Sequence, residues 1–298
     1  MEVPRIPPAL MLLAAAACLL LACPLNAAES DALFNVRLAH HSNIPNAANH
    51  SNRFGDRLMQ IDYRHDWRFI TTPGNWFSSG VLAQVDLHQR TRGMNRAAAG
   101  FALGYSHKFG LGPQAPRVSF RSQFLYQHFE GSLRRGLSQS WSLNLSRWLS
   151  ENVLLSGSWS WSDRAAPLQR ALRVNPAFEA DVFEQDQQQW SLQTDYLLSN
   201  GHALTLSTSF MEGDVAASAR PGTPLRQIAT AIARDNGIDR NYLAYRVSAR
   251  TRSAGLQWSI PLTGDSSMSL GSERRLARAD AGVRYQETRF FVDYLVRF

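Results

Sequence analysis

Apolar and charged side chains alternate over the last ten residues of the chain, from Arg289 to Phe298. Successive side chains of a β-strand point to opposite sides, so a period of two indicates a strand. Phe291 and Leu295 interrupt the charged positions. The chain therefore ends in a predicted strand whose apolar face consists of Phe290, Val292, Tyr294, Val296 and Phe298.

The same alternation recurs from residue 34 onward and predicts about twelve strands. Between residues 59 and 69, apolar or aromatic side chains hold the odd positions and polar ones hold 60 to 68. Five polar residues on one face are too many for the core of a β-sandwich, whereas they suit a water-filled or ion-paired barrel lumen. We expect the lumen to be lined by Gln60, Asp62, Arg64, Asp66, Arg68, Gln84, Asp86, His88, Arg90, Arg117, Arg121, Asp195, Arg289 and Asp293.

Two interpretations of these charged residues stay open. In the first, they form a charged constriction that selects solutes. In the second, they form structural ion pairs that fill a narrow barrel. A barrel of about twelve strands is too narrow for a wide porin.

Short and long connections alternate along the chain. The turn-rich connections 71–75, 110–116, 150–152, 199–202 and 263–266 are short, while 43–55, 163–189 and 214–241 are longer. Short turns on one side and long loops on the other are typical of bacterial outer-membrane barrels. Within the last long connection, apolar residues at helical spacing predict a short amphipathic helix over 224–234, either a plug in the barrel mouth or a cap on its rim.

The N-terminus predicts a signal peptide. An apolar run from Leu10 to Ala22 follows Arg5 and is too short to span a membrane. Cleavage after Ala27 gives a signal peptide over 1–27 and one barrel domain over 28–298. Residues 20–23 resemble a lipobox, so lipidation of Cys23 is the alternative. Without it the mature chain has no cysteine, which excludes disulfides, thiolate metal sites and cysteine nucleophiles.

The net charge of +7 comes almost entirely from arginine, because Lys108 is the only lysine. These arginines are scattered through the alternating segments, so we expect no nucleic-acid partner. Their planar guanidinium groups suit phosphates, such as those of lipopolysaccharide. No apolar run after the signal is long enough for a membrane-spanning helix.

A terminal strand that ends on an aromatic residue resembles the C-terminal assembly signal of bacterial outer-membrane β-barrel proteins. The resemblance implies an all-β, transmembrane antiparallel barrel in the outer membrane of a Gram-negative bacterium. Its partners would be outer-membrane lipids, lipopolysaccharide and the barrel-assembly machinery, with Phe290, Val292, Tyr294, Val296 and Phe298 as the assembly signal.

The segment His40-His41-Ser42-Asn43 resembles the active-site strand of outer-membrane phospholipase A and of lipid A deacylases. In those enzymes a histidine activates a serine two residues away. His40 and Ser42 have the same parity here. Asn49, Asn52 and Asp56 are nearby candidates for a third member, and no spacing singles one of them out. The motif opens the first strand, however, whereas in those families it lies far into the barrel. The alternative is a polar strand end that leads into an asparagine-rich turn.

A second resemblance covers more of the chain. Residues 36–47 resemble the first strand of a group of proteobacterial outer-membrane barrels and of the barrel domains of surface lipoprotein assembly modifiers. His41 stands where those proteins have aspartate. The resemblance implies a barrel and no particular activity.

We therefore expect a non-enzymatic outer-membrane barrel, either a narrow channel or a component for export or surface assembly. A lipid acyl hydrolase using His40 and Ser42, and a structural or adhesive surface protein, are the alternatives. The sequence contains no phosphate-binding loop, dinucleotide fingerprint or His-Glu-x-x-His motif, so we expect no cofactor and no metal.

Overall fold

The computed structural model describes residues 29–131, 134–165, 180–221, 229–280 and 282–298. The predicted signal peptide and both cysteines lie outside these residues. Helices in the described part are 3-10 turns: η1 (His50–Asn52), η2 (Arg92–Met94) and η5 (Ala180–Phe183). None of the helices described is long and apolar enough to cross a membrane.

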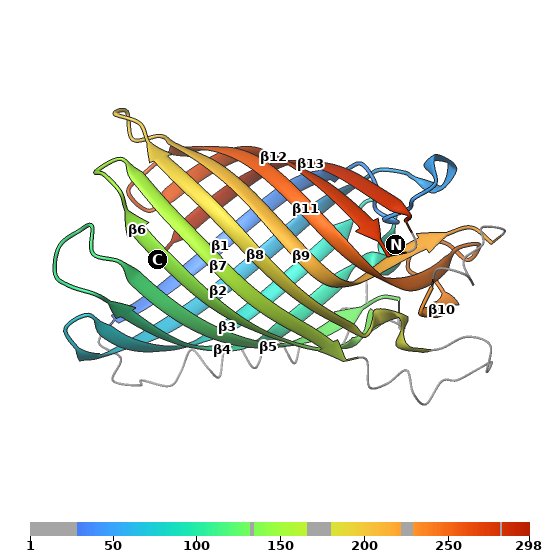
Figure 1. Ribbon diagram of the computed structural model, residues 1–298, viewed down its shortest axis with the longest axis horizontal. Helices are drawn as coiled ribbons and strands as arrows, with labels where there is room; N and C mark the ends of the chain where they lie inside the picture. The colour runs from blue at the N-terminus through green and yellow to red at the C-terminus, as the bar shows by residue number, and fades with distance from the viewer. Residues whose placement is uncertain (1–28, 132–133, 166–179, 222–228, 281) are drawn as a thin grey trace, which may run out of the picture.

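Antiparallel strands make up most of the described chain (Figure 1). All but β10 have at least 13 residues, more than the roughly 9–11 residues that a tilted strand needs to cross a bilayer. The strands are β1 (Glu29–His41), β2 (Asp56–Thr72), β3 (Asn75–His88), β4 (Arg96–Lys108), β5 (Arg117–Phe129), β6 (Gly136–Trp148), β7 (Val153–Ala165), β8 (Gln185–Leu197), β9 (Ala203–Ala219), β10 (Ala231–Arg234), β11 (Leu243–Pro261), β12 (Ser266–Ala279) and β13 (Arg284–Arg297).

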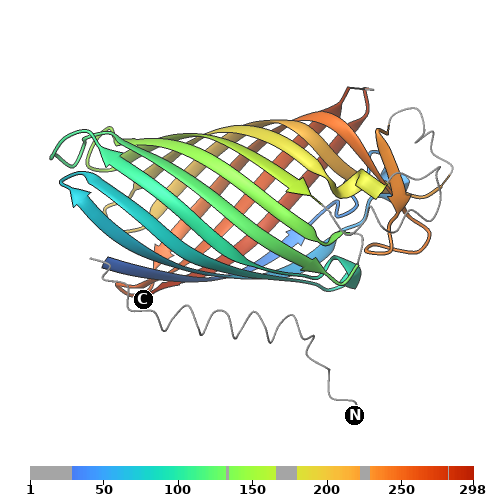
Figure 2. The same cartoon turned by 90° about the horizontal axis from the view of Figure 1, so that it is seen from below.

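The sheet closes on itself. β1 pairs with β2 on one side and with the last strand, β13, on the other, where Leu33 lies opposite Arg297. β9 pairs directly with β11, where Ala219 lies opposite Leu243. Twelve of the thirteen strands in the described residues thus form a closed antiparallel barrel, and the predicted fold is confirmed (Figures 1 and 2).

The two ends of the barrel differ. The short connections that follow β2, β4, β6, β8 and β11 lie at one end, which we call the turn end (left in Figure 1). The start of β1 and the end of β13 also lie at the turn end. They are adjacent, and the backbone N–H of Phe298 donates to the carbonyl of Ala32 at 2.9 Å. The longer connections lie at the opposite end, the loop end. This arrangement agrees with the alternation of short and long connections in the sequence.

β11 is one uninterrupted strand of 19 residues. It pairs with β9 and β12 without a shift of register, so the region around Ser253 to Gly255 holds no bulge. Its first residues extend past the end of β12, since Ala249 is the first residue of β11 to pair with β12, where it lies opposite Ala279.

The helix predicted over 224–234 is wrong at its C-terminal end. Ala231–Arg234 form β10, which pairs with residues Leu243 to Arg246 on the projecting part of β11. That edge of β11 offers unpaired backbone N–H and C=O groups, and pairing them outweighs the helical spacing of the side chains. The rest of the prediction, residues 222–228, lies outside the described residues.

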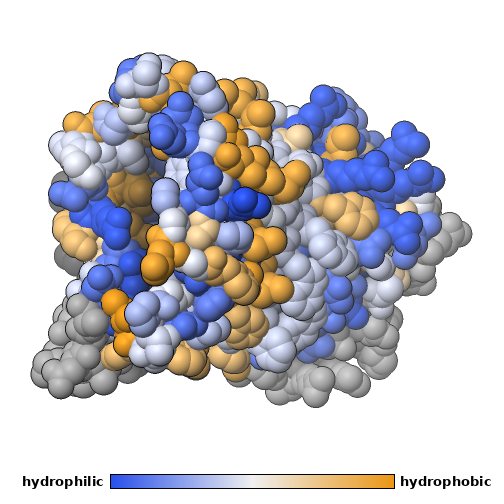
Figure 3. All heavy atoms as spheres, turned by 60° about the vertical axis from the view of Figure 1, so that its left-hand side comes forward, coloured by the Kyte–Doolittle hydropathy of each residue, from blue (hydrophilic) through white to orange (hydrophobic). Residues whose placement is uncertain are grey.

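Large apolar side chains cover the outside of the barrel. In a soluble monomer so many exposed apolar groups would be unusual, whereas a lipid-facing belt requires them. Figure 3 shows apolar side chains over the outer surface and hydrophilic ones toward both ends of the barrel. The exposed set includes Leu38, Phe77, Phe101, Leu103, Phe120, Leu143, Leu145, Leu192, Leu206, Leu256, Phe290 and Val292.

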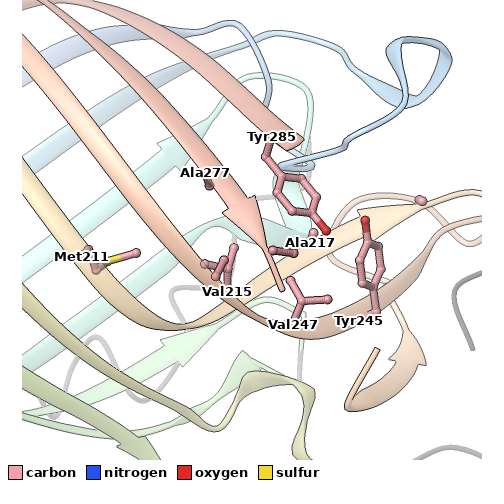
Figure 4. Packing of buried hydrophobic residues seen from close by; sticks show 10 residues of the cluster. Met211, Val215, Ala217, Tyr245, Val247, Ala277 and Tyr285 are labelled. Atoms are coloured by element: carbon pink, nitrogen blue, oxygen red, sulfur yellow. The ribbon is translucent and has the colours of Figure 1, made fainter. Parts of the chain in front are cut away.

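A hydrophobic core lies inside the barrel at the loop end, where β9, β11, β12 and β13 turn small or aromatic residues inward. Figure 4 shows the rings of Tyr245 and Tyr285 pointing toward one another beside Val247 and Ala217. Ala48, from the β1–β2 connection, packs against this cluster. The core therefore anchors the connection between β1 and β2.

Candidate functional site: the barrel lumen

The inner surface of the barrel has two walls of different chemistry. The inward positions of β12, β13 and β1 to β5 include arginines and carboxylates, which we call the charged wall. The inward positions of β6 to β9 hold mainly serine, threonine, asparagine and glutamine, which we call the neutral wall. Its members include Ser138, Ser140, Ser142, Asn144, Ser156, Ser158, Ser160, Gln187, Gln189, Ser191, Gln193, Thr205, Ser207 and Ser209.

Arg37 and Asp293 form a bidentate ion pair on the charged wall. They lie opposite one another where β1 meets β13, and Nε and Nη2 of Arg37 donate to the two carboxylate oxygens at 2.6 and 2.9 Å. The guanidinium also stacks 4.5 Å from the ring centre of Phe291. Phe291, which breaks the sequence pattern, thus turns inward. Its ring lies over Gly271, where an added Cβ would come within 2.3 Å of it.

Asp66 joins two arginines. It accepts hydrogen bonds from Nε of Arg64 and from Nη2 of Arg121, the latter at 3.2 Å. Arg121 is on β5, three strands away from Asp66 on β2, so the contact is made across the concave inside of the barrel. Asp66 is buried over Gly80, where a Cβ would lie 2.3 Å from its Oδ1. The glycine leaves the space that the carboxylate occupies.

Further pairs continue the charged wall toward both ends. Nε of Arg96 donates to Asp86 at 2.8 Å and its Nη2 donates to Gln84 at 3.2 Å. Near the turn end, Asp31 accepts from Arg68 at 3.0 Å and from Arg297 at 2.7 Å. Gln60 donates to Asp62 at 3.3 Å.

Glu287 is the centre of a buried cluster near the loop end. Its Oε1 lies 2.8 Å from Nδ1 of His41, and its Oε2 lies 3.1 Å from Arg289 and 3.7 Å from Arg275. Glu273 approaches the same two arginines, at 3.7 and 3.9 Å. Two acidic and two basic side chains therefore balance each other beside one histidine.

Hydroxyl pairs link the strands of the neutral wall. The Oγ atoms of Ser158 and Ser191 lie 2.6 Å apart, and Ser209 at the edge of the wall lies 2.7 Å from Ser253 on the adjoining strand β11. Asp195 accepts from Thr205 Oγ1 at 2.6 Å and from Gln193 Nε2 at 3.0 Å. This wall thus offers donors and acceptors with little formal charge.

The β1–β2 connection crosses the loop end of the lumen. The side chain of Asn43 fixes the conformation of this connection. Its amide nitrogen donates to the carbonyls of Ala47 and Gln286, and its amide oxygen accepts from the backbone N–H of Ala47. At its tip, the carbonyl of Pro45 accepts from the N–H of Ser218 on β9 at 2.7 Å. Because β9 lies far around the barrel from β1, this connection covers part of the mouth.

The β10–β11 connection covers the mouth from the other side. The buried carboxylate of Asp235 accepts from Nη2 of Arg134, in the β5–β6 connection, at 2.7 Å, and also from Ser218 Oγ. Gly237 packs against Gly93 in the β3–β4 connection. A Cβ added to Gly93 would lie 2.5 Å from the Cα of Gly237. Asp235, Arg134, Ser218 and the two glycines form what we call the mouth cap.

Two polar cavities lie beneath the mouth. One of about 490 Å³ is lined on the charged side by Asp86 and Arg96 and on the neutral side by Ser140, Ser162 and Gln187. The other, of about 160 Å³, is lined by Asn46, Gln187, Thr251, Arg275, Tyr285 and Glu287. Gln185 and Gln187 of β8 line both cavities.

Three residues on the predicted lumen list occupy places near the strand ends. His88 ends β3, with Nδ1 3.6 Å from the carboxylate of Asp56. Arg90 lies beyond β3, where its guanidinium stacks on Phe54. Arg117 starts β5 at the turn end and stacks on Trp76. The remaining predicted residues have the inward parity of their strands.

The three catalytic candidates do not form one hydrogen-bonded group within the described residues. The ring of His40 packs against Gly55. A Cβ added to Gly55 would lie 3.0 Å from Cε1 of His40. Ser42 Oγ accepts from the backbone N–H of Thr288 at 2.8 Å. Asn52 is buried in η1, and its N–H donates to the carbonyl of Asn49.

Sequence reasoning missed Arg37, Arg96, Arg275, Glu287 and the whole mouth cap. Strand parity places Arg37 on the inner face, and the charged partner directly opposite would have singled it out. Finding that partner requires the knowledge that β1 lies beside β13. For the contact between Asp235 and Arg134, which joins two connections, the sequence carries no signal that we recognise.

The comparisons with known proteins concern the fold. No family model and no curated protein matches the chain. An outer membrane channel from Pseudomonas putida F1 superposes with a TM-score of 0.57 at 10% sequence identity, covering 93% of this chain and 97% of that one. A calcium-bound dimer of outer membrane phospholipase from Salmonella typhi gives a TM-score of 0.45 at 10% identity, covering 88% of this chain and 90% of that one. The chain has the fold of bacterial outer-membrane β-barrels. The resemblance to surface lipoprotein assembly modifiers stays a prediction.

Proposed function

We propose that the protein is a non-enzymatic channel of the Gram-negative outer membrane, with a narrow lumen for small hydrophilic solutes. The observation that carries the proposal is the pair of polar walls in a closed barrel, with cavities of about 490 and 160 Å³ between them. The Pseudomonas putida protein of the same fold is an outer membrane channel, which agrees with this function.

The chemistry of the walls favours uncharged solutes that carry many hydroxyl groups. On the charged wall, Arg37, Arg96 and Arg121 already have carboxylate partners, which reduces the field that these arginines present to a passing ion. The neutral wall presents hydroxyl and amide groups, which exchange hydrogen bonds with a polyhydroxylated solute at little desolvation cost. A small sugar is the class of solute that fits both walls.

The membrane orientation follows from the two ends. We place the turn end in the periplasm and the loop end outside the cell, because outer-membrane barrels have short periplasmic turns and longer extracellular loops. The mouth cap then lies on the extracellular side.

Planar-bilayer recording tests the channel. We expect the purified wild-type protein to give small, steady conductance steps. Phe291→Ala, which removes an inward ring beside Arg37, should raise the step size, and sugar uptake into liposomes should rise in parallel. Phe290→Ala is the matched control, since the neighbouring ring points outward and is exposed.

A wild-type protein that folds but leaves the bilayer silent would contradict the proposal, and would favour a role in export or surface assembly. Equal conductance changes in the two phenylalanine variants would show that the lumen position of Phe291 does not limit flow.

A further inference from the structure

The outer surface of the barrel carries a patch of arginines near the loop end, on β11, β12 and β13. Arg250 lies opposite Arg278 across β11 and β12, and Arg278 lies opposite Arg284 across β12 and β13. The three form one row across neighbouring strands. Arg252 and Arg274 follow on the same face, nearer the turn end. All five side chains are exposed, and we call them the arginine patch.

The row contains no acidic residue that balances the positive charges of its three arginines. Like charges directly opposite each other in a sheet are destabilising. Arg250 pairs with Glu212 on β9 at 2.9 Å. Within the described part of the chain, the other four arginines of the patch make no side-chain hydrogen bond or ion pair. Repulsion of this kind is relieved when an anion binds between the guanidinium groups.

The patch lies closer to the loop end than the apolar belt on β11 and β13. On β11 the outward residues change from Arg250 and Arg252 to Leu256 and Trp258, and on β13 they change from Arg284 to Phe290 and Val292. Two residues advance a strand by about 7 Å, so Arg252 lies about 14 Å along β11 from Leu256, and Arg284 lies about 20 Å along β13 from Phe290. We place the change from hydrocarbon to headgroups within this interval. Figure 3 shows hydrophilic side chains gathered over the same end.

Apolar side chains lie within the patch as well. Phe210 and Leu276 flank Arg252 on the two neighbouring strands. A hollow of about 850 Å³ is lined by these three residues together with Arg250, Arg278 and Arg284, and Asp280 lies at its border. The site therefore joins several phosphate-binding groups to a contact for an acyl chain.

We propose that the arginine patch binds the phosphorylated glycolipid of the outer leaflet, the lipid A part of lipopolysaccharide. Planar guanidinium groups bind phosphate oxygens in bidentate fashion, and a row of three arginines matches a ligand with more than one phosphate. The location in the outer leaflet rests on the membrane orientation given under the proposed function. The binding itself does not require that the barrel conducts.

The first test uses the wild-type protein and varies the lipid. Native mass spectrometry of the protein in detergent should retain lipid A with two phosphates. The dephosphorylated form should bind at least about tenfold more weakly, the equivalent of one lost charge-assisted hydrogen bond. Inorganic phosphate and phosphatidylglycerol should not displace lipid A at equal concentration. Equal binding of dephosphorylated lipid A, or displacement by either competitor, would overturn the proposal.

The second test removes the charges. The triple variant Arg252→Gln, Arg278→Gln, Arg284→Gln should lose retained lipid A. Arg147→Gln, an exposed arginine on β6 at the turn end, should retain it. The heat-dependent gel mobility of each variant reports whether the barrel has formed. Undiminished binding in the folded triple variant would refute the patch, whereas its bilayer conductance bears only on the channel.

Discussion

At the scale of single residues, the charged side chains inside the barrel differ in whether a partner of opposite charge lies beside them. Asp66 occupies the space above Gly80 and receives two arginines from different strands, while Asp195 on the neutral wall has only neutral partners. Removing one member of a buried pair leaves the other charge without compensation, which costs more than the loss of a neutral hydrogen bond. The two aspartates therefore allow a matched comparison.

Asp66→Ala should destabilise the barrel strongly. The guanidinium groups of Arg64 and Arg121 would face one another without a carboxylate, at a cost on the order of 3 kcal/mol. Asp195→Ala should cost about 1 kcal/mol, because Thr205 and Gln193 can bind water instead. Reversible urea unfolding in lipid vesicles, followed by tryptophan fluorescence, measures both. Equal losses would mean that the ion pairs of the charged wall contribute no more than ordinary hydrogen bonds.

At the scale of strands, the sequence predicts what depends on local alternation. The strand count, the outward set from Leu38 to Phe290 and the short turns follow from a period of two and from turn residues. Three features depend on neighbours that are distant in sequence, and so escape this reasoning. β10 forms because β11 projects past β12, Phe291 turns inward over Gly271, and Arg37 meets Asp293 only once β1 lies beside β13.

The parity of β6 leads to a prediction for adjacent positions. Leu143 is exposed on the outer face, so arginine there should cost roughly 2–4 kcal/mol if the residue lies near the middle of the bilayer. Arginine at Ser142, on the neutral wall, should cost much less because it points into the polar lumen. Folding titrations in vesicles compare the two variants. A greater loss at Ser142 than at Leu143 would reverse the assigned faces of this strand.

At the scale of the whole molecule, the barrel differs between its ends. The described turn end is formed by short connections, and the loop end is crossed by two connections that meet at Ser218. The hydrophobic core also lies at the loop end, where Ala48 packs against inward residues of β9, β11, β12 and β13. The strands of a transmembrane barrel turn their apolar side chains outward to lipid and need no apolar core inside the lumen. The core therefore supports the connections that cover the mouth.

The contact between Arg134 and Asp235 should control how firmly the mouth is covered. Arg134→Ala and Asp235→Ala should each increase the conductance or the frequency of opening in planar bilayers, because the β10–β11 connection loses its tie to the β5–β6 connection. The double variant should add little to either single variant, since both remove the same interaction. Glu212→Ala is the control, because it breaks an exposed ion pair with Arg250 on the outer surface. Additive effects of the two substitutions, or an equal effect of Glu212→Ala, would show that the pair does not hold the cap in place.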